Sequence, residues 1–285
     1  MAGPEPIDLY HQGVDRLVGC YLLDTDDGPA LFDCGPSTTI DALKAGLADA
    51  GLKLTDVRHL LLSHIHLDHA GAAGSLVREH PALQVHVSSI GAPHLIDPER
   101  LEHIARRLYG DTFDRLWGEL APVPEANVRI VGDRVLGLDC FPTPGHASHH
   151  VSYLDRDGTL YAGDAAGVRV RPGRYVMPPT PPPEFDLETW QATVDEIERR
   201  GPERLALIHF GVADDPVRHL AELHLELYDW AEFVQGGATE EEFIAYCRTE
   251  LRDAGEDVAH YDLAMPLWQS YRGLVRWSEK QAEAA

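Results

Sequence analysis

Short apolar runs alternate with helix-like patterns up to about residue 212. Runs of about four to eight mainly apolar residues between turn-forming residues predict strands, and apolar positions three or four residues apart predict helices. On this basis we expect strands at residues 16–23, 29–33, 57–62, 83–87, 127–131, 134–140, 150–154, 159–162 and 204–208. We expect helices at 37–50, 71–79, 98–118 and 187–200. Such an alternation is typical of an α/β (α+β) fold.

The pattern beyond residue 213 is helical throughout. One apolar stripe recurs at spacings of three and four residues and predicts a helix: Leu220, Leu223, Leu227 and Trp230. Thr239 and Glu242 form a capping box for the next helix, and a third is expected at 262–280. We therefore divide the chain into a core domain at 1–212 and a helical C-terminal extension at 213–285 that packs on it. The alternative for the stripe is contact with a second copy in a homodimer.

The segment between residues 165 and 184 follows neither pattern. Five prolines lie between Pro178 and Pro183, and proline can neither continue a helix nor pair inside a sheet. We therefore expect a surface loop. Its polar side chains are candidates to bind a substrate carboxylate or phosphate, or else to pair with an acidic surface: Arg169, Arg171, Arg174 and Tyr175. Residues 94–118 are candidates to cover a pocket in which such a substrate would bind. Within this segment, Tyr109 and Trp117 fit a packing role better.

The composition narrows the class of partner. Asp and Glu number 47 against 24 Lys and Arg, so the net charge is −23, and such a surface repels phosphate backbones. We therefore expect a small-molecule substrate and no nucleic acid. No apolar stretch predicts a membrane span, and the N-terminus lacks the pattern of a secretory signal. The four cysteines lie far apart, as is typical of reduced thiols in a cytoplasmic protein.

The segment richest in chemical groups is Ser63-His64-Ile65-His66-Leu67-Asp68-His69. It directly follows the apolar run at 57–62, so its side chains stand where a buried strand ends. Imidazole and carboxylate are ligands preferred by zinc and by non-heme iron or manganese. Four donors in so short a span exceed what one ion usually takes from one loop, which makes two ions a candidate arrangement. The alternative is a surface histidine cluster.

Three later donors also follow predicted strands. His146 lies in Pro144-Gly145-His146, Asp164 follows Gly163, and His209 precedes Phe210-Gly211. Because strand ends can meet at one edge of a sheet, these side chains can join the earlier histidines. Together the segments supply enough donors for a catalytic binuclear metal site.

These motifs, in this order and with this spacing, resemble the metallo-β-lactamase-fold hydrolase superfamily and, within it, the glyoxalase-II-like branch. The turn Phe32-Asp33-Cys34-Gly35 is similar to that family's early aspartate-containing turn. The resemblance covers residues 33–211. It implies a four-layer αββα sandwich with the site at the edges of the sheets.

The resemblance also implies the ligands of two divalent metal ions, with zinc expected first and iron or manganese as alternatives. The first ion would take His64, His66 and His146, the second would take Asp68, His69 and His209, and Asp164 would bridge them. A carboxylate suits that place because its two oxygens can span ions about 3.5–4 Å apart. Three nearby residues are candidates to orient ligands by hydrogen bonds: Asp33, His149 and His150.

Two ions at that spacing can share a water that loses its proton near neutral pH, giving a bridging hydroxide. The resemblance therefore implies a hydrolase of a small acyl substrate, such as a thioester, a lactone or another ester. Asp68 is the candidate catalytic residue that accepts and relays the proton. One alternative is a persulfide-dioxygenase-like oxidoreductase with a single iron on His64, His146 and Asp164. A less favoured alternative is an RNase-Z-like phosphodiesterase, which the acidic charge opposes.

Overall fold

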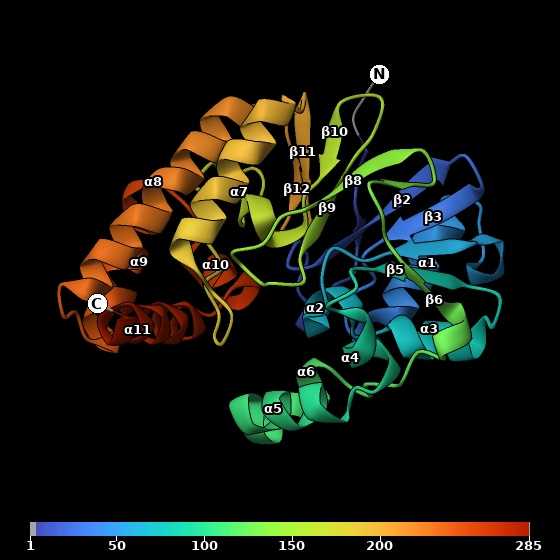
Figure 1. The fold of residues 1–285 in the computed structure, drawn as a ribbon, viewed down its shortest axis with the longest axis horizontal. Helices are drawn as coiled ribbons and strands as arrows, with labels where there is room; N and C mark the ends of the chain where they lie inside the picture. Colours follow the sequence, from blue (N-terminus) through green and yellow to red (C-terminus); the bar gives the residue numbers. More distant parts are fainter. Residues whose placement is uncertain (1–3, 285) are drawn as a thin grey trace.

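The structure is a computed structural model and describes residues 4–284. Two six-stranded β-sheets lie at its centre (Figure 1). The first sheet has the strands in chain order: β1 (Ile7–Asp8), β2 (Gly19–Thr25), β3 (Gly28–Phe32), β4 (His59–Leu61), β5 (Gln84–Val87) and β6 (Val128–Ile130). The second sheet has them in reverse: β12 (Gly211–Ala213), β11 (Arg204–Leu207), β10 (Thr159–Tyr161), β9 (Val151–Leu154), β8 (Leu138–Pro142) and β7 (Arg134–Val135).

The strand directions bring several strand ends together. In the first sheet β3, β4, β5 and β6 run parallel, so the carboxyl ends of β3 and β4 share one edge. In the second sheet β10 and β11 run parallel to each other, and β9 runs antiparallel to both β8 and β10. The carboxyl ends of β8, β10 and β11 therefore also share an edge. The loops that follow these strands carry the candidate ligands.

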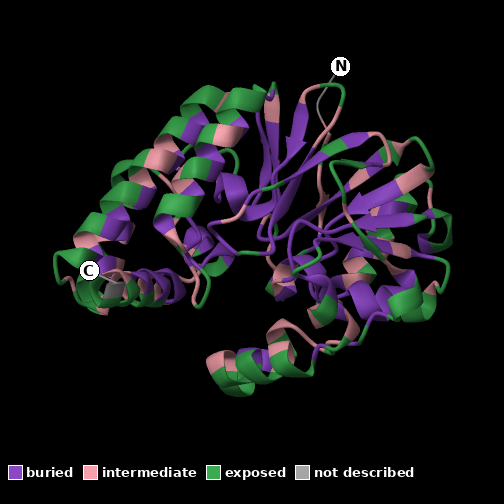
Figure 2. Cartoon of the chain, viewed as in Figure 1, coloured by how far each residue is buried: buried purple, intermediate pink, exposed green. Residues whose placement is uncertain are grey.

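Helices flank the two sheets on opposite sides (Figure 1). On the side of the first sheet lie α1 (Ile40–Asp49) and α3 (Ala73–Glu79). On the side of the second sheet lie α7 (Leu187–Arg200), α8 (Pro216–Gln235) and α9 (Glu240–Asp253). Figure 2 shows that both sheets are buried while the outer faces of these helices are exposed. The expected αββα arrangement with a helical C-terminal region is confirmed.

One apolar cluster runs through both sheets and into the C-terminal helices. Trp190 on α7 and Trp230 on α8 are among its largest fully buried side chains. The stripe of α8 lies inside the molecule and is therefore a packing surface, so it does not provide the homodimer face weighed from the sequence: Leu220, Leu223, Leu227 and Trp230. Because the cluster crosses residue 212, the division into 1–212 and 213–285 remains a prediction.

Several predicted elements are divided in the structure. The run at 134–140 is a hairpin of β7 and β8, because Leu136 and Gly137 turn with positive φ. The helix predicted at 98–118 becomes α5 (Glu99–Tyr109) and α6 (Phe113–Leu116), separated at Gly110. The helix predicted at 262–280 becomes α10 (Val258–Ala264) and α11 (Leu267–Ala284), separated at Pro266, which lacks the N–H that a helix interior needs.

The remaining short elements were not predicted. They are β1, β12, α2 (Leu67–Ala70) and α4 (Ala92–Ile96). Segments of two to five residues are too short to display an alternating or helical pattern, so pairing with neighbours decides them. None of the described helices combines the length and the apolar character needed to cross a membrane.

Candidate metal centre

The local backbone of two motifs explains how the ligands reach the sheet edge. Gly145 has φ +126°, and a Cβ there would lie 2.3 Å from the Cα of Trp190 on α7. Gly163 has φ +53°, and a Cβ there would lie 2.6 Å from the Cβ of Ser63. Only glycine avoids both the strained φ and the overlap. These two residues therefore let the chain pass close to its neighbours immediately before His146 and Asp164.

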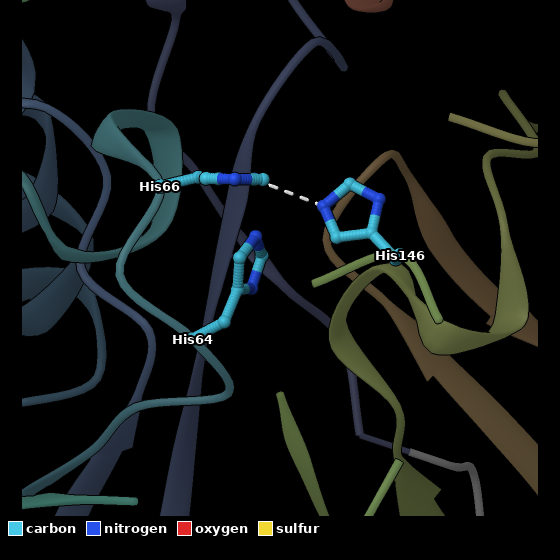
Figure 3. Close-up of side chains that lie close together, drawn as sticks. All are labelled: His64, His66 and His146. Atoms are coloured by element: carbon cyan, nitrogen blue, oxygen red, sulfur yellow. Dashed lines mark hydrogen bonds between the residues drawn. The ribbon is translucent and has the colours of Figure 1, made fainter. Parts of the chain in front are cut away.

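Three histidines form the first group of ligands, and they lie in loops that follow strands of both sheets (Figure 3). His64 and His66 lie in the loop after β4, and His146 lies in the loop after β8. Their side chains point toward one another, with His146 Nε2 2.9 Å from His66 Nδ1. One nitrogen from each ring lies within 4.8 Å of the others. The sequence analysis assigned these three residues to the first ion, and the structure brings them together.

The second group joins the start of α2 to the end of β11. Asp68 and His69 lie on α2, and His209 follows β11. The distance from His209 Nε2 to Asp68 Oδ2 is 3.4 Å, and that from His69 Nε2 to Asp68 Oδ1 is 3.9 Å. Ligand atoms from all three residues lie within 4.8 Å of one another. The structure therefore also gathers the residues that the sequence analysis assigned to the second ion.

Asp164 lies between the two groups, and its oxygens face different ways. Oδ2 is 3.3 Å from His146 Nε2 in the first group. Oδ1 is 3.3 Å from His69 Nε2 and 3.8 Å from His209 Nε2 in the second group. The carboxylate is almost fully buried, so its orientation is fixed by these surroundings.

In three of the five ligand histidines, a hydrogen bond to an outer partner places a proton on Nδ1. His69 donates from Nδ1 to Asp33 over 2.7 Å, His146 donates from Nδ1 to the carbonyl of Pro179 over 2.8 Å, and His209 donates from Nδ1 to the carbonyl of Leu17. In each ring this leaves the lone pair on Nε2, which faces the group. Such outer hydrogen bonds are typical of metal-ligating histidines.

Four of the ligand atoms that face inward are buried without hydrogen-bond partners among the described residues. They are His64 Nε2, His69 Nε2, His209 Nε2 and Asp164 Oδ1. Buried polar atoms are normally satisfied, and here four unsatisfied polar atoms lie close together. Nitrogen and carboxylate oxygen donors at these separations are the ligand set of a divalent transition metal. The residues therefore fit the metal ions that the sequence analysis expected.

The electrostatics of the centre agree with cation binding. Burial lowers the pKa of His64 and of His66 well below the usual value, so both rings stay neutral, as metal coordination requires. Burial also opposes charge on His69. The carboxylates of Asp164, Asp68 and Asp33 nevertheless raise its pKa well above the usual value. Three carboxylates around one buried ring form a negative site that a cation would neutralise.

Two of the three expected orienting residues form hydrogen bonds with the ligands. Asp33 accepts hydrogen bonds from the Ser63 backbone N–H at 2.8 Å and from the Ser63 hydroxyl at 2.7 Å, besides that of His69. His150 accepts a hydrogen bond from the backbone N–H of Asp164 through Nε2 at 3.1 Å. His149 is different, because its Nε2 lies 3.7 Å from Glu184 and its ring stacks on that of His64.

A family model covers most of this architecture. The model of the Metallo-beta-lactamase superfamily matches residues 14–209, which include every ligand described above. The chain belongs to this superfamily. The finer assignment to a glyoxalase-II-like branch stays a prediction.

Curated relatives of this superfamily are distant. The chain is 29% identical over 163 residues to the uncharacterized protein YobT of Bacillus subtilis, covering 53% of this chain and 63% of that protein. It is 27% identical over 205 residues to the metallo-beta-lactamase fold-containing protein ST1585 of Sulfurisphaera tokodaii, covering 67% and 76%. It is 26% identical over 167 residues to an N-acyl homoserine lactonase of a Bacillus species, covering 50% and 59%. The chain thus spans less than two thirds of the length of the first and the third of these relatives.

Solved structures share the fold over more of the chain. A metallo-beta-lactamase family protein of Thermus thermophilus superposes with a TM-score of 0.71 at 21% identity, covering 98% of this chain and 93% of the other. The protein TTHA1623, solved in a di-iron-bound form, has a TM-score of 0.54 at 25% identity, covering 72% and 91%. The first likeness extends through the C-terminal helices and concerns the fold alone.

A cavity of about 430 Å³ opens onto the centre. Its inner end is formed by four of the ligands: His66, Asp68, His146 and Asp164. Its walls come from α5, from the junction of α10 and α11, and from residues 181–184 of the proline-rich loop. Tyr109 and Trp117 both line it, so these two residues do more than pack and also belong to the roof that the sequence analysis weighed for residues 94–118.

The four polar residues of the loop do not line this cavity. Acidic residues outside the cavity contact all four of them. Arg169 Nη1 is 2.6 Å from Asp215, Arg174 Nη2 is 3.2 Å from the same carboxylate, and the Tyr175 hydroxyl donates to Glu226 over 2.8 Å. Arg171 Nη1 lies 3.8 Å from Glu5. All four side chains therefore pair with acidic groups, and their contact with a substrate stays a prediction.

His11 lines the cavity and was missed by the sequence analysis. It is almost fully buried, its ring stacks on that of Trp117 with centroids 5.3 Å apart, and burial lowers its pKa to about 4. Its Nδ1 has no hydrogen-bond partner among the described residues. The only sequence signal was an isolated histidine ahead of the first long strand, which belongs to no motif of the superfamily recognised above.

Proposed function

We propose that the protein is a binuclear metal-dependent hydrolase of a small acyl substrate, such as a thioester, a lactone or another ester. The observation that carries the proposal is the orientation of Asp164, whose two oxygens face two separate groups of ligands. A site for one ion has no use for a second complete group beyond that carboxylate. This favours two ions over the single iron of the dioxygenase-like alternative.

The ligands divide between two ions according to which ligand atoms lie close together. His64, His66 and His146 would hold one ion, and Asp68, His69 and His209 would hold the other, with Asp164 shared. Divalent ions bound there would supply Lewis acidity and lower the pKa of water, which is the chemistry that hydrolysis of an acyl group needs. We expect zinc first, with iron or manganese as alternatives, since ligands of this type accept all three.

Asp68 is the proposed proton acceptor. It lines the cavity, and its carboxylate is held at 3.4 Å from His209 Nε2 by the geometry of α2. Burial opposes the charge on this carboxyl, but His69 and His209 hold its pKa below the usual value. An ionised carboxylate at the inner end of the cavity can receive the proton that the attacking water releases.

The comparisons support an acyl substrate at the level of class. One relative is an N-acyl homoserine lactonase, and one solved structure holds two irons. The relatives are distant and overlap this chain only in part, so the choice between thioester, lactone and simple ester belongs to experiment. The mainly apolar walls of the cavity give a polynucleotide no cationic track, which argues against the phosphodiesterase alternative.

Two measurements test the proposal. Metal analysis of the protein loaded separately with zinc, iron and manganese should give two ions per chain. The zinc-loaded protein should release protons from at least one member of a panel of an acyl thioester, an acyl-homoserine lactone and an aryl ester. Asp68→Asn should abolish most of this turnover. One ion per chain, or turnover that is unchanged in Asp68→Asn at full metal content, would contradict the proposal.

A further inference from the structure

The helix α5 turns its apolar stripe toward the cavity. Positions at spacings of three and four residues all line it: Leu101, Ile104, Ala105, Leu108 and Tyr109. The polar residues between them lie on the other face of the helix. In a globular protein such a stripe normally packs on the core, yet Ala105 is the one member that is buried. Ile104 remains 46% exposed.

A second apolar wall stands opposite this stripe. It is formed by the junction of α10 and α11 and includes Leu263, Met265 and Pro266. Leu263 is 41% exposed, so both walls present apolar surface to the open cavity. Pro181, Pro182 and Pro183 also line the cavity. Apolar side chains from three separate parts of the chain therefore line the same cavity as the metal ligands.

Charged side chains are scarce in this cavity. Beyond the metal-facing residues, the charged side chains among its described lining are Arg100 and Glu184. Glu184 accepts hydrogen bonds from the backbone N–H and hydroxyl of Ser148, at 2.9 and 2.7 Å, and is thereby occupied. Arg100 is exposed on the first turn of α5. A substrate with several carboxylates, such as a glutathione conjugate, finds too few cationic partners here.

From these walls we propose that the substrate carries an apolar acyl chain that lies between α5 and the α10–α11 junction. Its carbonyl would then reach the inner end of the cavity, beside Asp68 and Asp164. This inference rests on the proposed function and specifies the substrate of the same site. The volume of about 430 Å³ lies within the range of about 300–1,000 Å³ that small-molecule pockets occupy. Each methylene buried between the walls adds to binding, up to about fourfold in affinity.

The first experiment compares two substrates that differ only in chain length. The zinc-loaded protein is assayed with the acetyl and the octanoyl thioesters of N-acetylcysteamine, so that the leaving group is constant. We expect kcat/KM for the octanoyl thioester to exceed that for the acetyl thioester by at least about 100-fold. Equal values for the two would overturn the inference but leave the hydrolase proposal intact.

Variants locate the effect on α5. Ile104→Asp and Leu108→Asp place a charge on the apolar wall, and we expect each to lower kcat/KM for the octanoyl thioester at least about tenfold. The acetyl thioester should change less than about threefold. Leu225→Asp is the matched control, because Leu225 is 62% exposed on α8 and does not line the cavity. A tenfold loss in the control, or the same loss for both substrates, would argue against a wall that selects the chain.

A binding measurement separates failure of the inference from failure of the hydrolase proposal. Calorimetry with octanoate and acetate reports on the apolar walls whether or not the thioesters are cleaved. We expect octanoate to bind at least about tenfold more tightly than acetate, with the preference lost in Ile104→Asp and kept in Leu225→Asp. Octanoate binding without turnover of any ester would refute the proposed function alone. Equal and weak binding of both acids would refute the inference.

Discussion

The inner end of the cavity and its outer walls are built on different principles. At the inner end, the ligand histidines His69, His146 and His209 are buried, and each donates a hydrogen bond from Nδ1 to a fixed partner. The walls are partly exposed, and Tyr109 on α5 is linked to α11 by hydrogen bonds with Gln269, at 3.3 and 3.2 Å, and by an edge-on contact with the ring of Trp268. The proposed metal ligands are therefore held by hydrogen bonds to buried partners, whereas the walls proposed to select the substrate lie on helices that are partly exposed.

The largest effect should come from breaking the shared ligand at the inner end. Asp164→Ala removes both oxygens that face the two groups. We expect the metal content to fall from two ions per chain and kcat/KM to drop at least about 1,000-fold, since several kcal/mol of charge stabilisation are lost. Metal analysis and steady-state kinetics on the purified variant check both effects.

A carboxylate outside the cavity provides the control for that variant. Asp215 pairs with Arg169 and Arg174 near the C-terminal helices. Asp215→Ala should keep two ions and nearly full turnover. If Asp164→Ala also kept two ions and nearly full turnover, the proposed distinction between a catalytic inner end and substrate-selecting walls would be wrong.

The next effect tests how firmly the ligands are held. Asp33→Ala removes the acceptor of the His69 Nδ1–H bond and leaves the Ser63 backbone N–H unpaired. We expect metal affinity to fall about 10–100-fold, the usual cost of losing such an outer partner. Competition with a chromogenic chelator measures it, and circular dichroism verifies the fold. An unchanged affinity in a folded variant would mean that the ligands hold their own positions.

A third variant separates the structural role of the C-terminal helices from their part in the cavity. Burial raises the pKa of Glu226 to about 7, although the Tyr175 hydroxyl donates to it. The folded protein therefore keeps a proton that the unfolded chain releases near pH 4.5, so this residue makes stability fall as pH rises through that window. Glu226→Gln should remove the fall and add about 1–2 kcal/mol of stability at pH 8.

Urea unfolding at pH 4.5 and pH 8 measures this difference. At pH 4.5 the variant and the wild type should agree, and kcat/KM should be the same in both at pH 8. A change in activity without a change in stability would show that Glu226 acts on the cavity after all.

The smallest effect should come from the contact between the walls. Tyr109→Phe removes the hydroxyl that pairs with Gln269 and keeps the ring that lines the cavity. We expect a loss of about 1 kcal/mol in the free energy of unfolding and little change in metal content. Thermal unfolding with and without bound zinc checks this. A large drop in metal content would mean that the walls and the inner end are coupled.

The sequence predicted the inner end far better than the walls. Four of the proposed ligands lie within six residues after an apolar strand: His64, His66, Asp68 and His69. Donors that lie so close together in the sequence can be recognised without a structure. The alternation of strands and helices predicted an α/β (α+β) fold, whereas the four-layer arrangement of the sheets came from the resemblance to the superfamily. The partners of the charged loop were not visible in the sequence, since Arg169 pairs with Asp215, which lies 46 residues further along the chain.

The walls could not be predicted because their partners are distant in the chain. Leu263 and Ile104 line the same cavity although they lie about 160 residues apart, so only the tertiary fold brings them together. The apolar stripe of α5 is visible in the sequence, but an amphipathic pattern does not say whether a helix covers a core or a cavity. His11 lacks any pattern at all, and only the tertiary fold places it beside Trp117.

The boundaries of α5 have a consequence for how this protein could diversify. The helix follows Pro98 and ends at Gly110, whose φ of +53° stops it. Its eleven residues therefore form a short segment with defined ends. None of them is among the proposed metal ligands. We therefore expect that substitutions in α5 can accumulate without loss of the proposed hydrolysis. Each substitution would change which substrates the cavity accepts. A library randomised at Leu101, Ile104 and Leu108 should yield members with altered chain-length preference and an unchanged metal content.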